Sequence, residues 1–566
     1  MGGADPSEGV RRGGRPLTGR VVRVLPDVAG IDRSFDYLAA SDVVVGEMVR
    51  VPLNGRVVTG WVIAIGDVSD GFSAVATSRL VSVAARVSCG PSAEVVALSA
   101  WIAEYWAGPR RAVLVSASPS GRVPRVATMA RRLKRQDVGH AVTLLRRGPL
   151  VDPVEVVRMA MRHGPLVVVV PTVSEARRIA ATLRGDGFSV ASNVTAWASA
   201  AGGVDVVVGA RSAILASAPD IGAIVVIDEH DDALQEERSP TWHARDVAVE
   251  RARRLGVPVV LHSPVPSPGA LALAEPDVAV DERASWPTVT VVERDGSSLI
   301  STELGLSLRD HARRVLCVLN TKGRSRLLAC MACRAIATCE QCDAAVTLDD
   351  SDSFACRRCG LRRPQICRRC GTSRMANIRP GTTRIAEELT AASGGRDVRL
   401  IEATEDIGSA PILVGTEAAL HRRIDVDEVW FLDADQEWAA PRFRAVECFV
   451  ALIGRAARLV GRRGTVAIQT ADPSSPVADL IARLDLDALA RRERNIRQRL
   501  DLPPFGAIAR VVGDVDLPAP RLGASATAHH GRDILVKGRD RGDVLALVAE
   551  MRASGRVRAY LDPPRV

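Results

Sequence analysis

Residues 327–370 read LLACMACRAIATCEQCDAAVTLDDSDSFACRRCGLRRPQICRRC and hold eight cysteines in four Cys-x-x-Cys pairs. Two intervening residues let both thiolates of a pair face one tetrahedral ion, and two such pairs complete a closed four-sulfur site. The segment therefore predicts two structural zinc ions with no open position for catalysis. The expected ligands are Cys330, Cys333, Cys339, Cys342, Cys356, Cys359, Cys367 and Cys370.

Other readings of the cluster fit less well. Disulfides or free thiols suit neither the tight spacing nor a reducing compartment, and an iron–sulfur centre is a weaker rival than zinc. The spacing leaves open whether the pairs share ions in a nested, sequential or interleaved order. Three further cysteines, Cys89, Cys317 and Cys448, lie outside the cluster, and we expect them to be ordinary core residues.

The chain around this segment is too long for one hydrophobic core. Its 566 residues predict about three to five domains. Residues 1–19 are rich in Gly, Arg and Pro and lack an apolar stretch, which predicts a disordered tail rather than a signal peptide. No run of about 18 apolar residues occurs, so we expect no membrane span and a cytoplasmic protein.

Hydrophobic patterning divides the remainder into an α/β multidomain chain. Short β-branched segments in 20–120 predict a β-rich domain, ending in a helix over 92–106 and a linker over 116–125. Alternating strands and helices in 126–285, and again in 286–326 and 371–500, predict two α/β units with parallel sheets. The cysteine segment 327–370 interrupts the second unit, and a small α/β domain is expected over 501–566.

The net charge of +9 suits a polyanionic partner, but an arginine-rich composition that only maintains solubility explains it equally well. Aromatic residues make up 3% of the chain, which argues against extensive stacking on bases. Nearly all basic residues are arginine, and the lysines are Lys134, Lys322 and Lys537.

The cysteine run and the RPGTTRI that follows it closely resemble the zinc-binding segment of the PriA family, the bacterial primosomal protein N′. SFDYL (34–38) and VRVPLNGRVVTGWV (49–62) resemble that family's domain for the 3′ end of a DNA strand. The family's two RecA-like helicase lobes and its C-terminal domain are resembled, in the same order, by VVIDEHD (225–231), ILVGTE, FLDAD and RLDLPPFGAIARV (499–511). The resemblance covers nearly all of the chain.

The resemblance implies a nested zinc arrangement, with the first and last pairs on one ion and the two inner pairs on the other. It also implies that Asp36 and Gly55 line a pocket for the terminal 3′ nucleotide, with a basic residue near Arg79. From the residues alone, Asp36 fits an Asx-type turn and Gly55 a tight hairpin.

The chain departs from the family at the nucleotide site. A phosphate loop needs a lysine followed by Ser or Thr, and the three lysines precede Arg135, Gly323 and Gly538. At the expected position the sequence reads GPLVDP (148–153), whose two prolines remove amide donors. We therefore expect neither ATP nor Mg²⁺ as a working cofactor.

Other motor blocks depart in the same way. Where the family has Glu-His, this chain has His230-Asp231, and where the family has Ser-Ala-Thr, it has His262-Ser263-Pro264. Ala451 stands in place of the family's glutamine, and the family's Lys-Gly pair is either replaced by Arg422-Arg423 or absent. The remnants that stay in place are Asp228, Glu229, Arg455 and Arg458, beside Gly454.

We expect a PriA-like replication restart protein that binds forked DNA and helps reload the replicative helicase near the nucleoid, with degenerate motor lobes as a scaffold. Single-strand-binding protein and primosome or helicase-loading proteins are the implied partners. Basic residues around the cysteines either contact phosphates or partners, or form a solvated face: Arg324, Arg326, Arg357, Arg358, Arg362, Arg363, Arg368 and Arg369. The alternatives are an ATP-driven 3′-to-5′ helicase with an atypical nucleotide site, and a zinc adaptor without DNA affinity.

Overall fold

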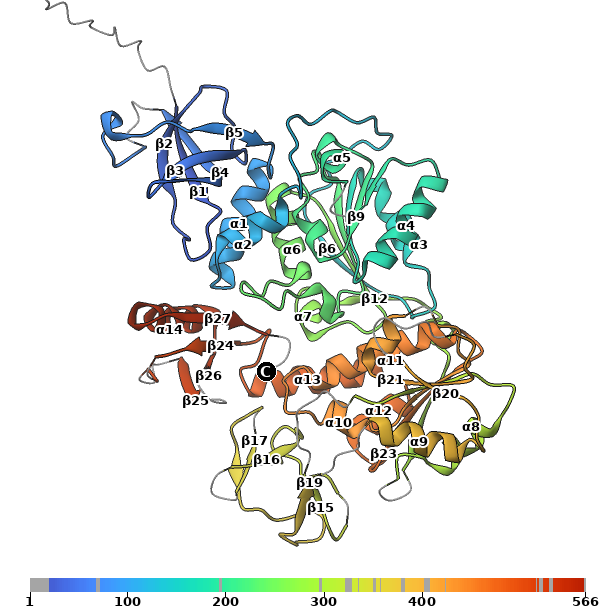
Figure 1. Cartoon of the computed structure of the whole chain (residues 1–566). Coiled ribbons are helices and arrows are strands. Elements are labelled where there is room, and N and C mark those ends of the chain that lie inside the picture. Colours follow the sequence, from blue (N-terminus) through green and yellow to red (C-terminus); the bar gives the residue numbers. More distant parts are fainter. Residues whose placement is uncertain are drawn as a thin grey trace, which may run out of the picture.

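The computed structural model describes residues 20–67, 72–192, 196–294, 298–320, 328–333, 335–349, 353–356, 358–377, 382–401, 408–422, 424–515, 517–518, 523–528 and 533–563. The expected tail 1–19 lies outside these residues, as do Lys322, Arg324, Arg326, Arg357 and Arg423. Figure 1 shows a β-rich N-terminal part, two α/β lobes, a cysteine module beside the second lobe, and a small C-terminal domain.

The N-terminal part is an antiparallel sheet of order β2-β1-β4-β3-β5, and a bridge between Leu38 and Ser82 brings the segment before β5 back to β2. Two helices follow, and Ser92 caps the first of them by accepting from the Val95 amide. The elements are β1 (Arg20–Pro26), β2 (Phe35–Ala39), β3 (Met48–Leu53), β4 (Arg56–Asp67), η2 (Thr77–Arg79), β5 (Ala85–Ser88), α1 (Ala93–Tyr105) and α2 (Arg110–Ala117).

Lobe 1 is built on a seven-stranded sheet of order β12-β6-β11-β10-β7-β9-β8, in which the paired strands are parallel. Its central strands are wholly buried and rich in Val and Ile, as a sheet covered by helices on both faces requires. The strands are β6 (Val142–Arg146), β7 (Leu166–Val169), β8 (Val190–Ser192), β9 (Val206–Gly209), β10 (Ala223–Ile227), β11 (Val259–Ser263) and β12 (Pro276–Val278). The helices are α3 (Pro153–Ala160), η3 (Met161–His163), α4 (Val173–Gly185), α5 (Trp197–Gly202), η5 (Arg211–Leu215), η6 (Asp232–Leu234), α6 (Ala244–Leu255), α7 (Pro268–Leu271) and η7 (Arg283–Ser285).

Lobe 2 repeats this design with a six-stranded parallel sheet of order β13-β23-β22-β14-β21-β20. The cysteine module enters between β14 and α9. The strands are β13 (Thr288–Glu293), β14 (Val315–Val318), β20 (Val398–Leu400), β21 (Ile412–Gly415), β22 (Glu428–Phe431) and β23 (Thr465–Thr470). The helices are α8 (Thr302–Arg309), α9 (Thr382–Ala392), η8 (Glu417–His421), α10 (Asp435–Trp438), α11 (Ala445–Val460), α12 (Pro476–Ala482) and α13 (Leu486–Arg499).

The two smaller parts pack against α13. The module contains β15 (Leu328–Cys330), β16 (Val346–Leu348), β17 (Phe354–Cys356), β18 (Arg362–Arg363) and β19 (Met375–Asn377). The C-terminal domain contains β24 (Ala507–Gly513), β25 (Ala524–Ala528), β26 (Asp533–Gly538), α14 (Arg541–Ser554) and β27 (Val557–Leu561). One apolar cluster joins module residues such as Phe354 to Ile496 and Leu500 of α13 and Ile508 of β24. In the part of the chain that is described, no helix is both long and apolar enough to cross a bilayer.

Candidate functional site: a self-filled nucleotide cleft and two cysteine groups

The eight cysteines form two separate groups in the module. The outer group is Cys330, Cys333, Cys367 and Cys370, and the inner group is Cys339, Cys342, Cys356 and Cys359. Within each group the sulfur atoms lie within 4.8 Å of one another, and all eight thiols are free of disulfides. The first and last pairs form the outer group and the two middle pairs form the inner group, so the nested order is the one adopted.

The donor set of each group fits a tetrahedral zinc ion. The Cys333 amide approaches the Cys330 sulfur at 3.5 Å, and this contact is the main cause that lowers the pKa of the Cys330 thiol. Such amide contacts favour the thiolate that a metal binds. Four sulfurs leave no position for a substrate, so a metal held there would organise the fold of a segment that has little apolar core.

The arginines around the module have different surroundings. Arg362, Arg368 and Arg369 are exposed, whereas Arg363 stacks on Phe354 at 4.6 Å. Arg358 is 7% exposed and pairs with Glu493 of α13 at 3.0 Å. The expectation of a phosphate contact or a solvated face is therefore wrong for Arg358, because its neighbours in the sequence are inner-group cysteines that pack against α13.

In lobe 1, the loop between β6 and α3 stands where a phosphate loop is expected, and its amides already donate within the chain. Pro149 and Pro153 have no amide hydrogen. The donors and acceptors are Leu150 N to Ser285 O (3.3 Å), Val151 N to Gly148 O (3.1 Å), Val154 N to Asp152 Oδ1 (3.0 Å) and Glu155 N to Asp152 O (3.0 Å). This loop therefore presents no nest of free amides from these residues to a phosphate.

Asp228 follows β10 directly, at the carboxyl edge of the sheet, and faces Arg458 of α11 in the other lobe. Arg458 forms two hydrogen bonds with the Asp228 carboxylate, one of them at 2.7 Å. Its Nε donates to the carbonyl of Pro149 at 3.0 Å, so one guanidinium joins the altered loop to the carboxylate. Burial raises the pKa of Asp228, but the facing Arg458 outweighs it and holds that pKa well below its usual range.

Glu229 has a structural position next to Asp228. Both of its oxygens accept from Ser267, from the amide at 2.7 Å and the hydroxyl at 2.7 Å, and Arg245 lies 3.2 Å away. Ser267 caps α7, so Glu229 secures the start of that helix. Both carboxylate oxygens are thus engaged by side-chain and backbone groups of lobe 1.

The histidines beside these carboxylates are buried and neutral. Burial lowers the pKa of His230 to about 3 and that of His262 to about 4. His230 Nδ1 lies 2.7 Å from the Ser263 hydroxyl, while His262 lies 3.6 Å from Asp228. The residues that differ from the family's motor blocks thus form a packed core behind Asp228.

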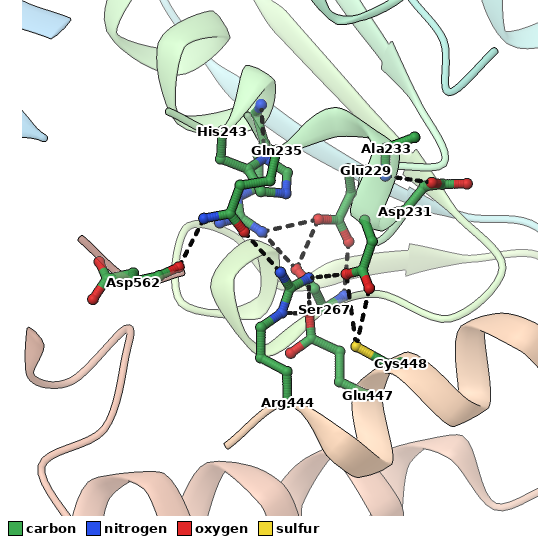
Figure 2. Close-up of polar contacts among 12 residues, drawn as sticks. Glu229, Asp231, Ala233, Gln235, His243, Ser267, Arg444, Glu447, Cys448 and Asp562 are labelled. Carbon is green, nitrogen blue, oxygen red and sulfur yellow. Dashed lines mark hydrogen bonds and ion pairs between the residues drawn. The ribbon is translucent and has the colours of Figure 1, made fainter. Parts of the chain in front are cut away.

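Two further arginines of lobe 2 hold lobe 1. Arg455 pairs with Asp231, and Arg444 donates to the Gln235 side chain at 2.8 Å and lies 3.1 Å from Asp232. Figure 2 shows Arg444 at the centre of this network, with Gln235 also donating to the Asp562 carbonyl of the C-terminal domain at 2.7 Å. The lobes are therefore joined by direct ion pairs of the protein itself.

A cavity of about 890 Å³ lies beside these pairs, between α2, lobe 1 and lobe 2. Cys448 is part of its lining and lies 3.4 Å from an Asp232 oxygen. Cys448 and Cys89 are only half-buried, so the expectation that they are core residues is wrong for both. Cys448 faces this interface, and Cys89 follows β5, where its amide donates to the Val123 carbonyl. Cys317 is fully buried in β14, as expected.

These residues do not fit a nucleotide with Mg²⁺. The cation that a metal or a lysine would supply at Asp228 comes from Arg458, and the loop amides are engaged. Sequence reasoning identified Asp228, Arg455 and Arg458 as remnants, but it missed Gln235 and Arg444. Their pairing joins positions 209 residues apart, for which the sequence carries no local signal.

The expected 3′-end residues lie in the N-terminal part. Asp36 is in β2, opposite Arg23 of β1, and both its oxygens accept from that guanidinium, at 2.9 and 3.3 Å. Gly55 follows Asn54 in the two-residue turn between β3 and β4, where φ is 49° at Asn54 and 75° at Gly55. The hairpin reading of Gly55 therefore holds, whereas the Asx-turn reading of Asp36 is wrong. Arg79 ends η2 and is exposed, shortly before the strand segment that pairs with β2.

Two parallel α/β sheets that meet across a shared interface, with a cysteine module inserted in the second, define a helicase-like chain of the two-lobed RecA type. Residues 23–119 match the family of the PriA 3′DNA-binding domain (3′BD). The probable replication restart protein PriA of Mycobacterium tuberculosis is 27% identical over 559 residues, which is 86% of this chain and 85% of that protein. The chain thus carries a match to the PriA 3′DNA-binding domain, and over most of its length it is similar to replication restart proteins PriA.

Other relatives match a shorter stretch. The replication restart protein PriA of Bacillus subtilis is 28% identical over 382 residues, 59% of this chain and 47% of its own length. That of Haemophilus influenzae is 27% identical over 336 residues, 53% of this chain and 46% of its own length. The match thus spans about half the length of these two proteins.

Solved helicase structures are only loosely similar. Saccharomyces cerevisiae Dbp5 bound to RNA and ADP BeF₃ has 11% identity and a TM-score of 0.34, covering 64% of this chain and 90% of Dbp5. The DUF1998 helicase MrfA bound to DNA and AMPPNP has 11% identity and a TM-score of 0.34, covering 62% of this chain and 49% of MrfA. The fold assignment rests on the sheet orders given above and not on these likenesses.

Proposed function

We propose that this chain is a PriA-type restart protein that binds abandoned or stalled DNA forks and helps reassemble the primosome, without unwinding DNA at the expense of ATP. The observation that carries the proposal is the Arg458–Asp228 pair, with the same guanidinium bound to the Pro149 carbonyl. A nucleotide could enter only if this contact opened. Phosphoryl transfer also needs cationic groups on the β- and γ-phosphates, and no lysine of the described phosphate-loop segment supplies one.

In this proposal each four-cysteine group holds one Zn²⁺, and the metal orders the module. The nested grouping of sulfurs supports two ions of structural type. The exposed arginines of the module would face the DNA backbone or partner proteins. The same role is proposed for surfaces of the domain over 20–120 and of the lobes over 126–285, 286–326 and 371–500.

The proposed contact with the 3′ end is made by Asp36, Gly55 and Arg79. Arg23 fixes the Asp36 carboxylate, whose side chain is 11% exposed, and a carboxylate held in this way can still accept from a 3′-hydroxyl. The Gly55 turn has open space around it, and Arg79 supplies an exposed cation for a phosphate. The implied partners are forked DNA, single-strand-binding protein and helicase-loading proteins, in the bacterial cytoplasm at the nucleoid.

The test combines binding and turnover on the purified full chain. Fluorescence anisotropy with a labelled fork is measured for a 3′-hydroxyl end and a 3′-phosphate end, with and without a non-hydrolysable ATP analogue. We expect tighter binding of the hydroxyl end, no effect of the analogue, and ATP turnover at background. Equal affinity for both ends would contradict the end pocket.

A second candidate is an ATP-dependent 3′-to-5′ helicase with an atypical nucleotide site. It is favoured by the retention of Asp228 and Glu229 after β10 and of Arg455 and Arg458 on the facing helix. Fork-stimulated ATP hydrolysis that is lost in Asp228→Asn would establish this candidate and overturn the first one.

A further inference from the structure

A row of buried charges of alternating sign runs from the inner cysteine group to lobe 1. We call it the buried charge row. Its members are Arg358, Glu493, Arg497, Glu447 and Arg444, whose side chains are between 2% and 6% exposed. Charged side chains are almost never this buried unless each is paired, and in the row Arg358 pairs with Glu493, while Glu447 pairs with both Arg497 and Arg444.

The row begins inside the inner cysteine group. Arg358 lies between Cys356 and Cys359, and it donates to the Cys342 carbonyl at 3.4 Å and to Glu493 Oε2 at 3.0 Å. Its position is therefore set by the fold of the inner group.

The row continues along α13. Glu493 and Arg497 are four residues apart and so lie on one face of that helix. Arg497 donates to Glu447 of α11 at 2.7 Å and to the carbonyls of Phe443 and Pro503 at 3.2 Å each. The guanidinium thereby ties α13 to the start of α11.

The row ends at the junction between the lobes. Glu447 accepts from Arg444 at 2.8 Å, and Arg444 then reaches Gln235 and Asp232 of lobe 1. Figure 2 shows this end of the row, where Arg444 stands between Glu447 and Gln235. Glu447, which orients Arg444, is thus itself held by Arg497 of α13, the helix that packs against the module.

The two cysteine groups differ in their relation to this row. Cys339, Cys342, Cys356 and Cys359 belong to the apolar cluster that includes Ile496 and Leu500 of α13. Cys370 of the outer group is exposed, and its sulfur contact is with Cys330. Among the described residues, the outer group therefore has no buried ion pair with α13 like the one that Arg358 of the inner group forms with Glu493.

We propose that the inner cysteine group, through the buried charge row, holds Arg444 in position and so stabilises the contact between the two lobes, whereas the outer group does not. The Arg358–Glu493 pair holds α13 against the inner group, and one turn further along α13 Arg497 holds Glu447 and, through it, Arg444. Contact alone does not establish such coupling, so the test measures it at the far end.

The experiment is hydrogen–deuterium exchange on the full zinc-loaded chain, without DNA or nucleotide, read at residues 232–243 of lobe 1. Glu493→Gln removes the charge that links Arg358 to α13, and Cys356→Ser removes an inner ligand. We expect each to accelerate exchange at 232–243 by about tenfold or more, because a weakened junction opens more often. The expected control without effect is Cys370→Ser in the outer group, whose sulfur is exposed and lies against Cys330.

Two results overturn the proposal: unchanged exchange at 232–243 in Glu493→Gln, or an equal acceleration in Cys370→Ser. If Glu493→Gln does not fold, Arg358→Lys replaces it, since a lysine keeps the charge but cannot reach both Cys342 and Glu493. That variant is expected to accelerate the same segment, and unchanged exchange in it also overturns the proposal. If the sites are coupled, the double variant Glu493→Gln with Asp232→Asn accelerates exchange at 232–243 by less than the product of the two single-variant accelerations. An acceleration equal to that product excludes coupling. None of these readouts depends on whether the chain hydrolyses ATP.

Discussion

Replacing Arg458 by methionine removes the cation that faces Asp228 and keeps a side chain of similar length. The Asp228 side chain is 7% exposed, so its carboxylate is left buried without its main partner. Breaking a buried pair in this way costs about 3–5 kcal/mol. Because the Arg458 side chain is 29% exposed, water reaches one side of the pair, and we expect the lower end, about 3 kcal/mol.

The pH dependence of this loss follows from the pKa of Asp228. In the wild type Arg458 holds that pKa below its value in the unfolded chain, so the pair stabilises the fold above about pH 4 and loses its effect below it. In Arg458→Met, burial alone acts and raises the pKa of Asp228 above its unfolded value. The variant then has its largest deficit relative to the wild type where Asp228 is ionised, and that deficit shrinks as the pH falls through the raised pKa toward the unfolded value of about 4.

Thermal unfolding followed by circular dichroism measures the effect. With about 2–4 °C per kcal/mol for a lobe of this size, we expect the midpoint to fall by about 6–12 °C at neutral pH. Arg483→Met is the matched control, because Arg483 forms an exposed pair with Asp479 and should shift the midpoint by no more than about 2 °C. Adding Asp228→Asn to Arg458→Met should restore most of the loss. The reasoning is refuted if Arg458→Met behaves like Arg483→Met, or if the two substitutions add.

Three further outcomes are expected. Chelation under denaturing conditions should release about two equivalents of zinc per chain, measured by mass spectrometry, and fewer than about 1.5 equivalents would contradict two sites. Chelation of the native protein should make the segment 328–377 cleavable by protease while lobe 1 stays intact, because each ion supplies roughly 10 kcal/mol of folding free energy to the module. Raising salt from about 50 to about 200 mM should weaken fork binding at least tenfold in anisotropy, through release of counterions, and a flat dependence would exclude a backbone-dominated interface. Asp36→Ala should reduce the preference for a 3′-hydroxyl over a 3′-phosphate by about tenfold, whereas Asp67→Asn, at an exposed pair with Arg20 in the same sheet, should leave it unchanged; an equal effect of both would assign Asp36 to the fold of the sheet alone.

Local patterns predicted several of the regular elements, although the linker expected over 116–125 begins inside α2. The β-branched runs at Leu166–Val169 and Ala223–Ile227 became buried parallel strands, because such a run between helices has both faces covered. The cysteine spacing was equally informative, since each Cys-x-x-Cys pair is a local unit. Which pairs lie together depends on the tertiary fold, so the spacing alone left the nested, sequential and interleaved orders open. The family resemblance implied the nested order, and the sulfur groups have that order.

Side-chain partners across the fold lay beyond the sequence. Arg458 and Asp228 are 230 residues apart, and Arg358 and Glu493 are 135 apart, so no period or spacing relates them. Arg23 and Asp36 are an intermediate case. Their pairing follows once the register of β1 against β2 is known, but register depends on which faces of the strands are buried. The exposure of Cys448 likewise depends on where the two lobes meet.

The retention of Asp228 and Glu229 in a chain that has lost its phosphate loop has a structural explanation. A buried carboxylate cannot simply be left in place when its usual cation is gone, because an unpaired charge at that depth destabilises the fold. Arg458 supplies the cation to Asp228, and Ser267 with Arg245 satisfies Glu229 at the start of α7. Each acidic residue is therefore held by contacts within the chain, which explain its retention without reference to ATP hydrolysis. By the same reasoning, adding a lysine and a serine to the loop would leave Arg458 on the Asp228 carboxylate and Pro149 without an amide hydrogen.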